Sequence, residues 1–161
     1  MSSTGRIPNY DDVVDAAQRI AGHAVTTPLI ESAVLNERVG GRVFVKAEML
    51  QRTGAFKFRG AWNRISQLTN LERRAGVVTF SSGNHGQAVA AAARLSKINS
   101  TVVMPRTAPN IKLENARSYG AKIVLYDPAT ESRETIAGAI ASRTGAILVP
   151  PYDDPRIIAG Q

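Results

Sequence analysis

Residues 77–104 read VVTFSSGNHGQAVAAAARLSKINSTVVM, and this stretch decides the fold class. A short apolar run at 77–80 leads into a polar, glycine-containing loop, and residues 87–95 then have the composition and spacing of a helix. A second apolar run follows at 101–104. Two short strands joined by a helix of this length are typical of a βαβ unit, in which both strands lie parallel in one sheet.

The same alternation continues on both sides of this unit. The spacing predicts helices at residues 11–21, 58–68, 111–119 and 132–142, and strands at 42–46, 122–126 and 146–149. The small residues at 88–93 indicate a helix packed closely on a sheet. We therefore predict an α/β fold built on parallel, open sheets flanked by helices.

Composition excludes several classes of function. The chain has no cysteine, and His23 and His85 are its only histidines, so we expect no disulfide and no metal site. Its net charge of +7 suits an anionic small molecule, whereas the scattered basic residues argue against nucleic acid. No apolar stretch is long enough for a membrane helix, and the first residues lack a signal-peptide pattern. We expect a soluble, cytoplasmic protein without a membrane partner.

The segment TGAFKFRGA at residues 53–61 places Lys57 between Phe56 and Phe58. Partial desolvation would lower the pKa of this lysine and make its neutral amine available to attack an aldehyde. Arg59 would act in the same direction. On local chemistry alone, the more common reading is a packed lysine stem with a solvated amine.

The segment SSGNHGQ at residues 81–87 follows one predicted strand and precedes a helix. Ligands gather at this end of parallel strands, where free N–H groups of the next helix favour an anion. The density of hydrogen-bonding side chains favours a ligand loop over a plain turn. Ser82 and His85 are not a nucleophile and its base, because no G-x-S-x-G elbow surrounds them.

These two motifs together resemble the fold-type II (tryptophan synthase β-like) enzymes that depend on pyridoxal 5′-phosphate (PLP). The sequence is most similar to serine and threonine dehydratases and serine racemase. The resemblance runs from about residue 11 to the end and includes the segments VVMP at 102–105, YGA at 119–121, ESRE at 131–134 and PRIIAGQ at 155–161.

The resemblance implies a role for each motif residue. Lys57 would hold PLP as a Schiff base, Phe56 would flank the ring, and Asn84 would bind the phenolic oxygen of the cofactor. The loop formed by Ser81, Ser82, Gly83, Asn84 and His85 would receive the substrate carboxylate. Arg133 is a candidate partner for a distal carboxylate, with a surface arginine as the alternative.

The implied reaction is dehydration and deamination of L-threonine or L-serine to a 2-oxo acid and ammonia, with Lys57 also acting as general base. Ser82 matches the second acid/base of the racemases, so serine racemase stays an alternative, and another β-hydroxy amino acid such as hydroxyaspartate stays open as substrate. A third alternative is a non-catalytic remnant that binds an anion or a partner.

The resemblance also implies a domain division. Residues 1–68 and 148–161 would belong to a large PLP domain and residues 75–147 would form a small α/β domain. The full chains of the family are about twice as long, and their glycine-rich phosphate loop has no counterpart here. We therefore expect a truncated large domain, uncertain activity of these 161 residues alone, and a homo-oligomer in the full-length form.

Overall fold

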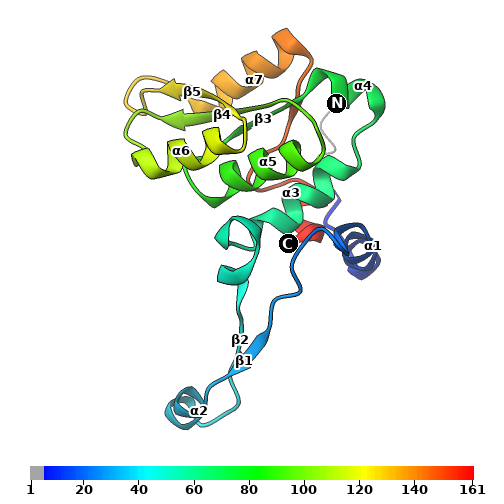
Figure 1. Cartoon of the computed structure of the whole chain (residues 1–161), viewed down its shortest axis with the longest axis vertical. Helices are drawn as coiled ribbons and strands as arrows, with labels where there is room; N and C mark the ends of the chain where they lie inside the picture. Colours follow the sequence, from blue (N-terminus) through cyan, green and yellow to red (C-terminus); the bar gives the residue numbers. More distant parts are fainter. Residues whose placement is uncertain (1–5) are drawn as a thin grey trace.

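The computed structural model describes residues 6–161 and confirms the α/β fold. Its main element is a four-stranded sheet in the order β5-β4-β3-β6, in which all neighbouring strands are parallel. The strands are β3 (Val77–Phe80), β4 (Ser100–Pro105), β5 (Lys122–Tyr126) and β6 (Ile147–Leu148). Figure 1 shows this sheet in the upper half of the molecule, surrounded by helices.

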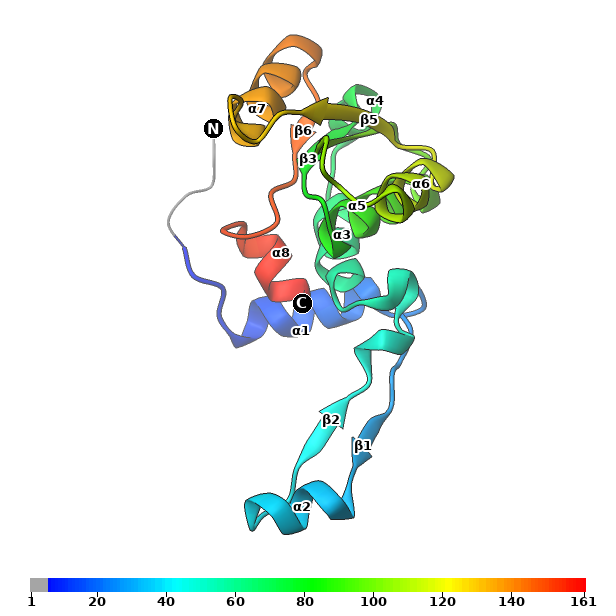
Figure 2. The same cartoon turned by 90° about the vertical axis from the view of Figure 1, so that its left-hand side faces the viewer.

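Helices cover both faces of the sheet. They are α5 (Asn84–Leu95) and α6 (Asn110–Ser118) on one face and α7 (Arg133–Thr144) on the other, as Figure 2 shows. Alternate residues of β4 point to opposite sides: Val102 and Met104 pack with α5 and α6, whereas Val103 packs with Ala137 of α7. Because both faces are covered, the strands are short, largely apolar runs without alternation.

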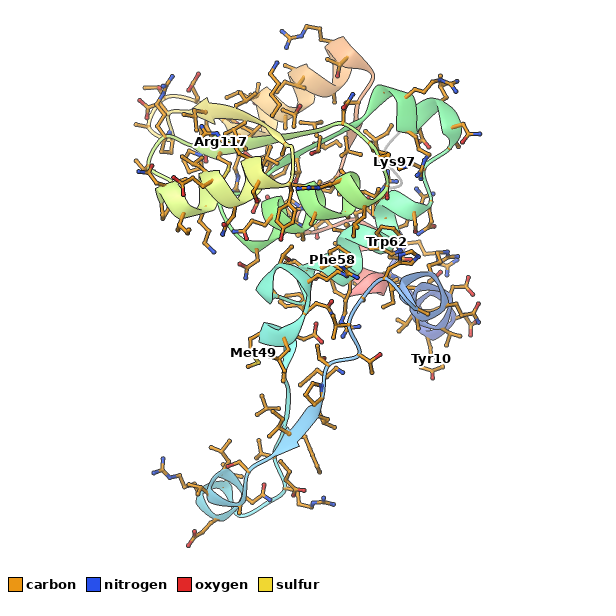
Figure 3. All side chains as sticks on the ribbon, viewed as in Figure 1. Tyr10, Met49, Phe58, Trp62, Lys97 and Arg117 are labelled. Carbon is orange, nitrogen blue, oxygen red and sulfur yellow. The ribbon has the colours of Figure 1, made fainter. Side chains whose placement is uncertain are left out.

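A second helical layer lies against α5. It consists of α1 (Tyr10–Ile20), α3 (Lys57–Ser66) and the short α8 (Pro155–Gly160). Helices α3 and α8 cross at Gly60 and Gly160, where a Cβ on Gly60 would lie 2.6 Å from the carbonyl oxygen of Ile157. Only glycine permits so close a backbone approach. Figure 3 shows the aromatic side chains of Phe58 and Trp62 at this junction.

Residues 29–46 form an arm that projects away from the body in both views (Figures 1 and 2). The arm contains β1 (Leu29–Glu31), α2 (Ala33–Val39) and β2 (Phe44–Lys46). Its two strands pair antiparallel, and every residue in them is exposed. Two short 3-10 turns, η1 (Glu48–Leu50) and η2 (Arg52–Gly54), connect the arm to α3.

The fold class and the predicted elements of the central sheet are confirmed. The strand expected near residues 42–46 pairs antiparallel with β1, which the sequence did not predict. Three helices were also not predicted: α2, α4 (Asn70–Ala75) and α8. Between residues 6 and 161, no helix has the length and apolarity of a membrane span. The division into residues 1–68, 75–147 and 148–161 stays a prediction.

Candidate functional site

Lys57 is the first residue of α3 and lies at the end of an unusual turn. Thr53 and Gly54 both have left-handed backbones, with φ of 62° and 71°, and Ala55 is extended. A left-handed conformation at a threonine is uncommon and is found most often at functional sites. The turn directs the chain into α3 so that Lys57 begins the helix.

The amine of Lys57 reaches the segment that follows β6. Its Nζ donates to the carbonyl oxygen of Pro151 at 3.0 Å and to Oε1 of Gln161 at 3.3 Å. It also lies 5.2 Å from the centre of the Phe56 ring. Partial burial lowers the pKa of Lys57, because desolvation penalises the ammonium form. The amine therefore has the character that addition to an aldehyde requires.

Two expectations for the surroundings of Lys57 need correction. Phe58 is fully buried and stacks on Trp62 at 6.2 Å, so only Phe56 flanks the amine. Arg59 does not contribute to the lowered pKa of Lys57, for which burial is the cause. The guanidinium of Arg59 is instead bound by the carboxylate of Glu48, which neutralises its charge.

The loop at residues 81–85 lies at the carboxyl end of β3, as predicted. Ser81 N donates to the carbonyl oxygen of Val103 at 3.1 Å, which extends the strand pairing by one residue. The Ser81 hydroxyl accepts from Gly83 N at 3.2 Å and tightens the loop. Helix α5 then begins at Asn84 without a side-chain cap. Its first N–H groups are therefore free of a capping side chain, and the helix dipole favours an anion there.

Glycine is required where the loop enters α5. A Cβ on Gly86 would lie 2.7 Å from the carbonyl oxygen of Ser81 and 3.0 Å from the side chain of Val102. Ser82 and Asn84, by contrast, are exposed and accessible to a small molecule. The loop therefore has a closely packed inner side and an open polar side.

The ring of His85 lies on the inner side of the loop. It is 2% exposed, and its Nε2 donates to the carbonyl oxygen of Val149 at 3.1 Å, while Nδ1 has no partner. Burial lowers the pKa of His85 to about 4, the bond to Val149 opposes the shift, and the charge of Lys57 adds to it. His85 is neutral at physiological pH, and any ligand contact would come from its backbone N–H.

Residues 149–151 connect the two motifs. His85 binds the carbonyl oxygen of Val149, and Lys57 binds that of Pro151. Helices α3 and α5, which carry the two residues, also pack directly against each other. The lysine and the polar loop, separated in the sequence, are thus fixed to one short segment. Sequence reasoning missed the contributions of this segment and of Gln161, because a backbone carbonyl has no side-chain signature.

Arg133 lies beside the same strand end, at the start of α7. Its guanidinium is 5.3 Å from the centre of the Phe80 ring and binds Oε1 of Glu134 at 2.8 Å. Phe80 in turn meets the edge of Tyr152, whose hydroxyl donates to Glu134 at 3.4 Å. Arg133 is therefore next to the polar loop but is held by a neighbouring carboxylate.

The site has the groups that an aldehyde cofactor with an anionic substrate would use. It offers a lysine amine with a lowered pKa, an adjacent aromatic ring and the open polar loop. No group of three or more metal-ligating side chains occurs between residues 6 and 161.

Comparison with known proteins agrees with this geometry. The chain is 49% identical over 97% of its length to an L-threo-3-hydroxyaspartate ammonia-lyase of Pseudomonas sp, and covers 49% of it. It is 42% identical over 94% of its length to the catabolic L-threonine dehydratase of Escherichia coli (strain K12), and covers 46% of it. The structure of maize serine racemase matches 96% of the chain with a TM-score of 0.92 and 41% identity, and the chain covers 47% of it.

The chain thus spans about half the length of the curated relatives it matches. A family model described as pyridoxal-phosphate dependent enzyme matches residues 20–161, which include Lys57 and the loop at 81–85. The chain belongs to the family of pyridoxal-phosphate dependent enzymes.

Proposed function

We propose that this protein converts L-threonine or L-serine to the corresponding 2-oxo acid and ammonia, with PLP as cofactor. The observation that carries the proposal is the position of Lys57, whose partly buried amine lies at the start of α3 and is joined to the polar loop through residues 149–151. The names of the relatives support this class, since they include two ammonia-lyases or dehydratases of hydroxylated amino acids.

Each residue of the site has a proposed role. Lys57 Nζ holds the aldehyde carbon of PLP, Phe56 flanks the ring, and the amide of Asn84 binds its phenolic oxygen. PLP supplies the electron sink that makes a Cα proton removable. To hold the cofactor, Lys57 Nζ would have to give up its hydrogen bonds to Pro151 and Gln161.

The loop would orient the amino acid through its carboxylate. We propose that Ser81, Ser82, Gly83 and the backbone N–H of His85 surround this group at the uncapped start of α5. The neutral ring of His85 keeps the loop fixed to Val149. Arg133 is proposed for a second carboxylate, and to reach one it would have to exchange Glu134 for the ligand.

The proton steps follow from the lowered pKa of Lys57. Once the amino group of the substrate had taken the place of Nζ on the cofactor, the released neutral amine of Lys57 would take the Cα proton. The β-hydroxyl would leave as water with that proton, and the return of Nζ to the cofactor would release the enamine. The imine tautomer of this enamine would then add water and lose its nitrogen as ammonia. One water is released and one consumed, so the net products are the 2-oxo acid and ammonia.

A serine racemase is the second candidate. The observation in its favour is that Ser82, in the loop that would bind the substrate, is exposed and therefore free to exchange a proton with it. The match to maize serine racemase supports this candidate as well. The homo-oligomeric state and the cytoplasmic location stay predictions.

The test is a substrate panel with the purified chain and PLP. L-threonine, L-serine and L-threo-3-hydroxyaspartate are each assayed for ammonia, for the 2-oxo acid and, by chiral chromatography, for the D-enantiomer. Lys57→Ala should abolish all products, whereas Lys97→Ala, at an exposed lysine of the same chain, should leave them unchanged. Ser82→Ala should remove D-serine formation and retain ammonia release from L-serine.

Four outcomes separate the candidates. Ammonia release that depends on Lys57 supports the lyase, and a D-enantiomer that depends on Ser82 supports the racemase. Turnover that persists in Lys57→Ala contradicts both. A folded chain that binds PLP at Lys57 and releases neither product is a binding module.

A further inference from the structure

A network of hydrogen bonds lies at the base of the arm, close to Lys57. The guanidinium of Arg59 binds both oxygens of Glu48, with Nε to Oε2 at 2.9 Å and Nη2 to Oε1 at 2.6 Å. The same Nη2 donates to the carbonyl oxygen of Val25 at 3.1 Å, and the hydroxyl of Thr27 donates to Glu48 at 2.5 Å. The side chains of Arg59 and Glu48 are only 15% and 17% exposed.

Other side chains from residues 46–59 bind the same segment, residues 23–27. The amide of Gln51 accepts from Val25 N and donates to Val25 O, both at 2.9 Å. Arg52 Nε donates to the carbonyl oxygen of His23 and Lys46 Nζ to that of Thr27, both at 2.5 Å. The chain that leads into Lys57 is thus fixed along its length to residues 23–27.

The residues of this network lie before and after the left-handed turn at Thr53 and Gly54 along the chain. Gln51 binds before the turn and Arg59 binds after it, two residues beyond Lys57. A threonine with φ of 62° is held there only if its surroundings fix it, because the conformation is unfavourable. Arg59 therefore anchors the first turn of α3, whose first residue is Lys57.

We propose that Arg59 and Glu48 are positioning residues for Lys57: their paired side chains hold the start of α3 so that Nζ stays against Pro151 and Gln161. The inference rests on the proposed role of Lys57. Arg59 and Glu48 touch no reacting group and act through the backbone of α3.

The burial of this pair favours positioning over stability. A buried ion pair gains little net free energy, since desolvation offsets most of the attraction, and an apolar pair of similar size would stabilise the fold as well. The pair instead fixes orientation, because the two parallel hydrogen bonds between a guanidinium and a carboxylate hold both side chains in one geometry.

The arm contains a matched pair with the same geometry. Arg42 binds Glu31 through Nε at 2.8 Å and Nη2 at 2.7 Å, but Arg42 is 72% exposed and lies away from α3. Arg42→Met is therefore the control for Arg59→Met. The charge of Lys57 lowers the pKa of His85, and both variants retain His85.

The test measures the pH dependence of reductive methylation of Lys57 by formaldehyde and borohydride, read by mass spectrometry of the Lys57 peptide. It needs no cofactor and uses the whole chain. The exposed Lys97 and Lys122 serve as internal references. Glu48→Gln is measured beside Arg59→Met. Because glutamine keeps the shape of the Glu48 side chain, this variant tests the inference if Arg59→Met fails to fold.

We expect the pH profile of Lys57 in Arg59→Met and Glu48→Gln to move upward, toward the profiles of the reference lysines, and that of Arg42→Met to match the unmodified chain. The inference is overturned if Lys57 keeps its profile in folded Arg59→Met or Glu48→Gln. Failure of the proposed function would look different: Lys57 in the unmodified chain would show the shifted profile but capture no PLP.

Discussion

The central sheet and the N-terminal region of this chain differ in how far they bury their apolar side chains. Strand β3 is buried at every position, and β4 and its helices enclose two clusters of buried side chains. In contrast, most of the large hydrophobic side chains exposed between residues 6 and 161 lie between Ile7 and Phe56. The arm is the extreme case, since both of its strands are exposed throughout.

The difference shows which part of the fold is self-sufficient. Four parallel strands covered by helices on both faces bury their own apolar surface, whereas a two-stranded ribbon has no such cover and is marginal in water by itself. Lys57 lies at the boundary: α3 packs on the central helices, and the turn before it is fixed to the base of the arm. Contacts from both regions thus fix the position of Lys57.

We expect the largest difference in stability between the two regions when a methionine is replaced in each. Met104 is 1% exposed on β4, and Met49 is 64% exposed at the base of the arm (Figure 3). We expect Met104→Ala to lower the free energy of unfolding by about 2–5 kcal/mol, from lost burial and a cavity. Met49→Ala should change it by less than about 0.5 kcal/mol. Urea unfolding measures both, and equal losses would show that the arm is covered in solution.

The buried His85 makes the stability of the central region depend on pH. The folded-state pKa of His85, about 4, lies below that of an unfolded chain, so the unfolded state binds more protons between pH 6.5 and 4. As the pH falls through this window, the free energy of unfolding decreases by about 3 kcal/mol, because the unfolded chain gains a proton that the buried ring does not. Above the window this loss is absent. His85→Gln should flatten the pH dependence of the free energy of unfolding between pH 6.5 and 5, which lies above the range where carboxylates contribute. A slope that survives in His85→Gln would contradict the assignment.

Two glycines give the smallest expected effects, with opposite signs. Gly86→Ala places a Cβ against the Ser81 carbonyl and should cost about 1–3 kcal/mol by overpacking. Gly138 lies inside α7 with open space around it, so Gly138→Ala should gain about 0.5–1 kcal/mol. Thermal unfolding distinguishes them. If Gly86→Ala left the thermal stability unchanged, the loop at residues 81–85 would relax easily and would not be fixed as described.

The sequence predicted the central sheet well because its strands are buried on both faces, which makes apolar runs and helical spacing clear. It missed β1 because an exposed three-residue strand leaves no periodic signal. Signals for the missed helices did exist. Thr69 and Glu72 form a capping box before α4, and Ser32 and Gly40 cap the ends of α2.

The candidate site was predictable only in part. Lys57 and the loop at residues 81–85 were selected from motifs, because the side chains in these two segments form recognisable sequence patterns. The acceptors of the Lys57 amine were not, since the carbonyl of Pro151 lies 94 residues away and any residue could supply it. The binding of Arg59 by Glu48 was missed for a similar reason: no local pattern links a helix arginine to a carboxylate in a preceding turn.

Borohydride trapping of PLP on the purified chain, followed by mass spectrometry of its peptides, tests directly whether Lys57 holds the cofactor. We predict a visible absorbance band on addition of PLP and a reduced adduct on Lys57 that far exceeds those on Lys97 and Lys122, with the band lost in Lys57→Ala. Labelling spread evenly over the exposed lysines of a folded chain, with Lys57 unmodified, would contradict the assignment of Lys57 as the residue that holds the cofactor.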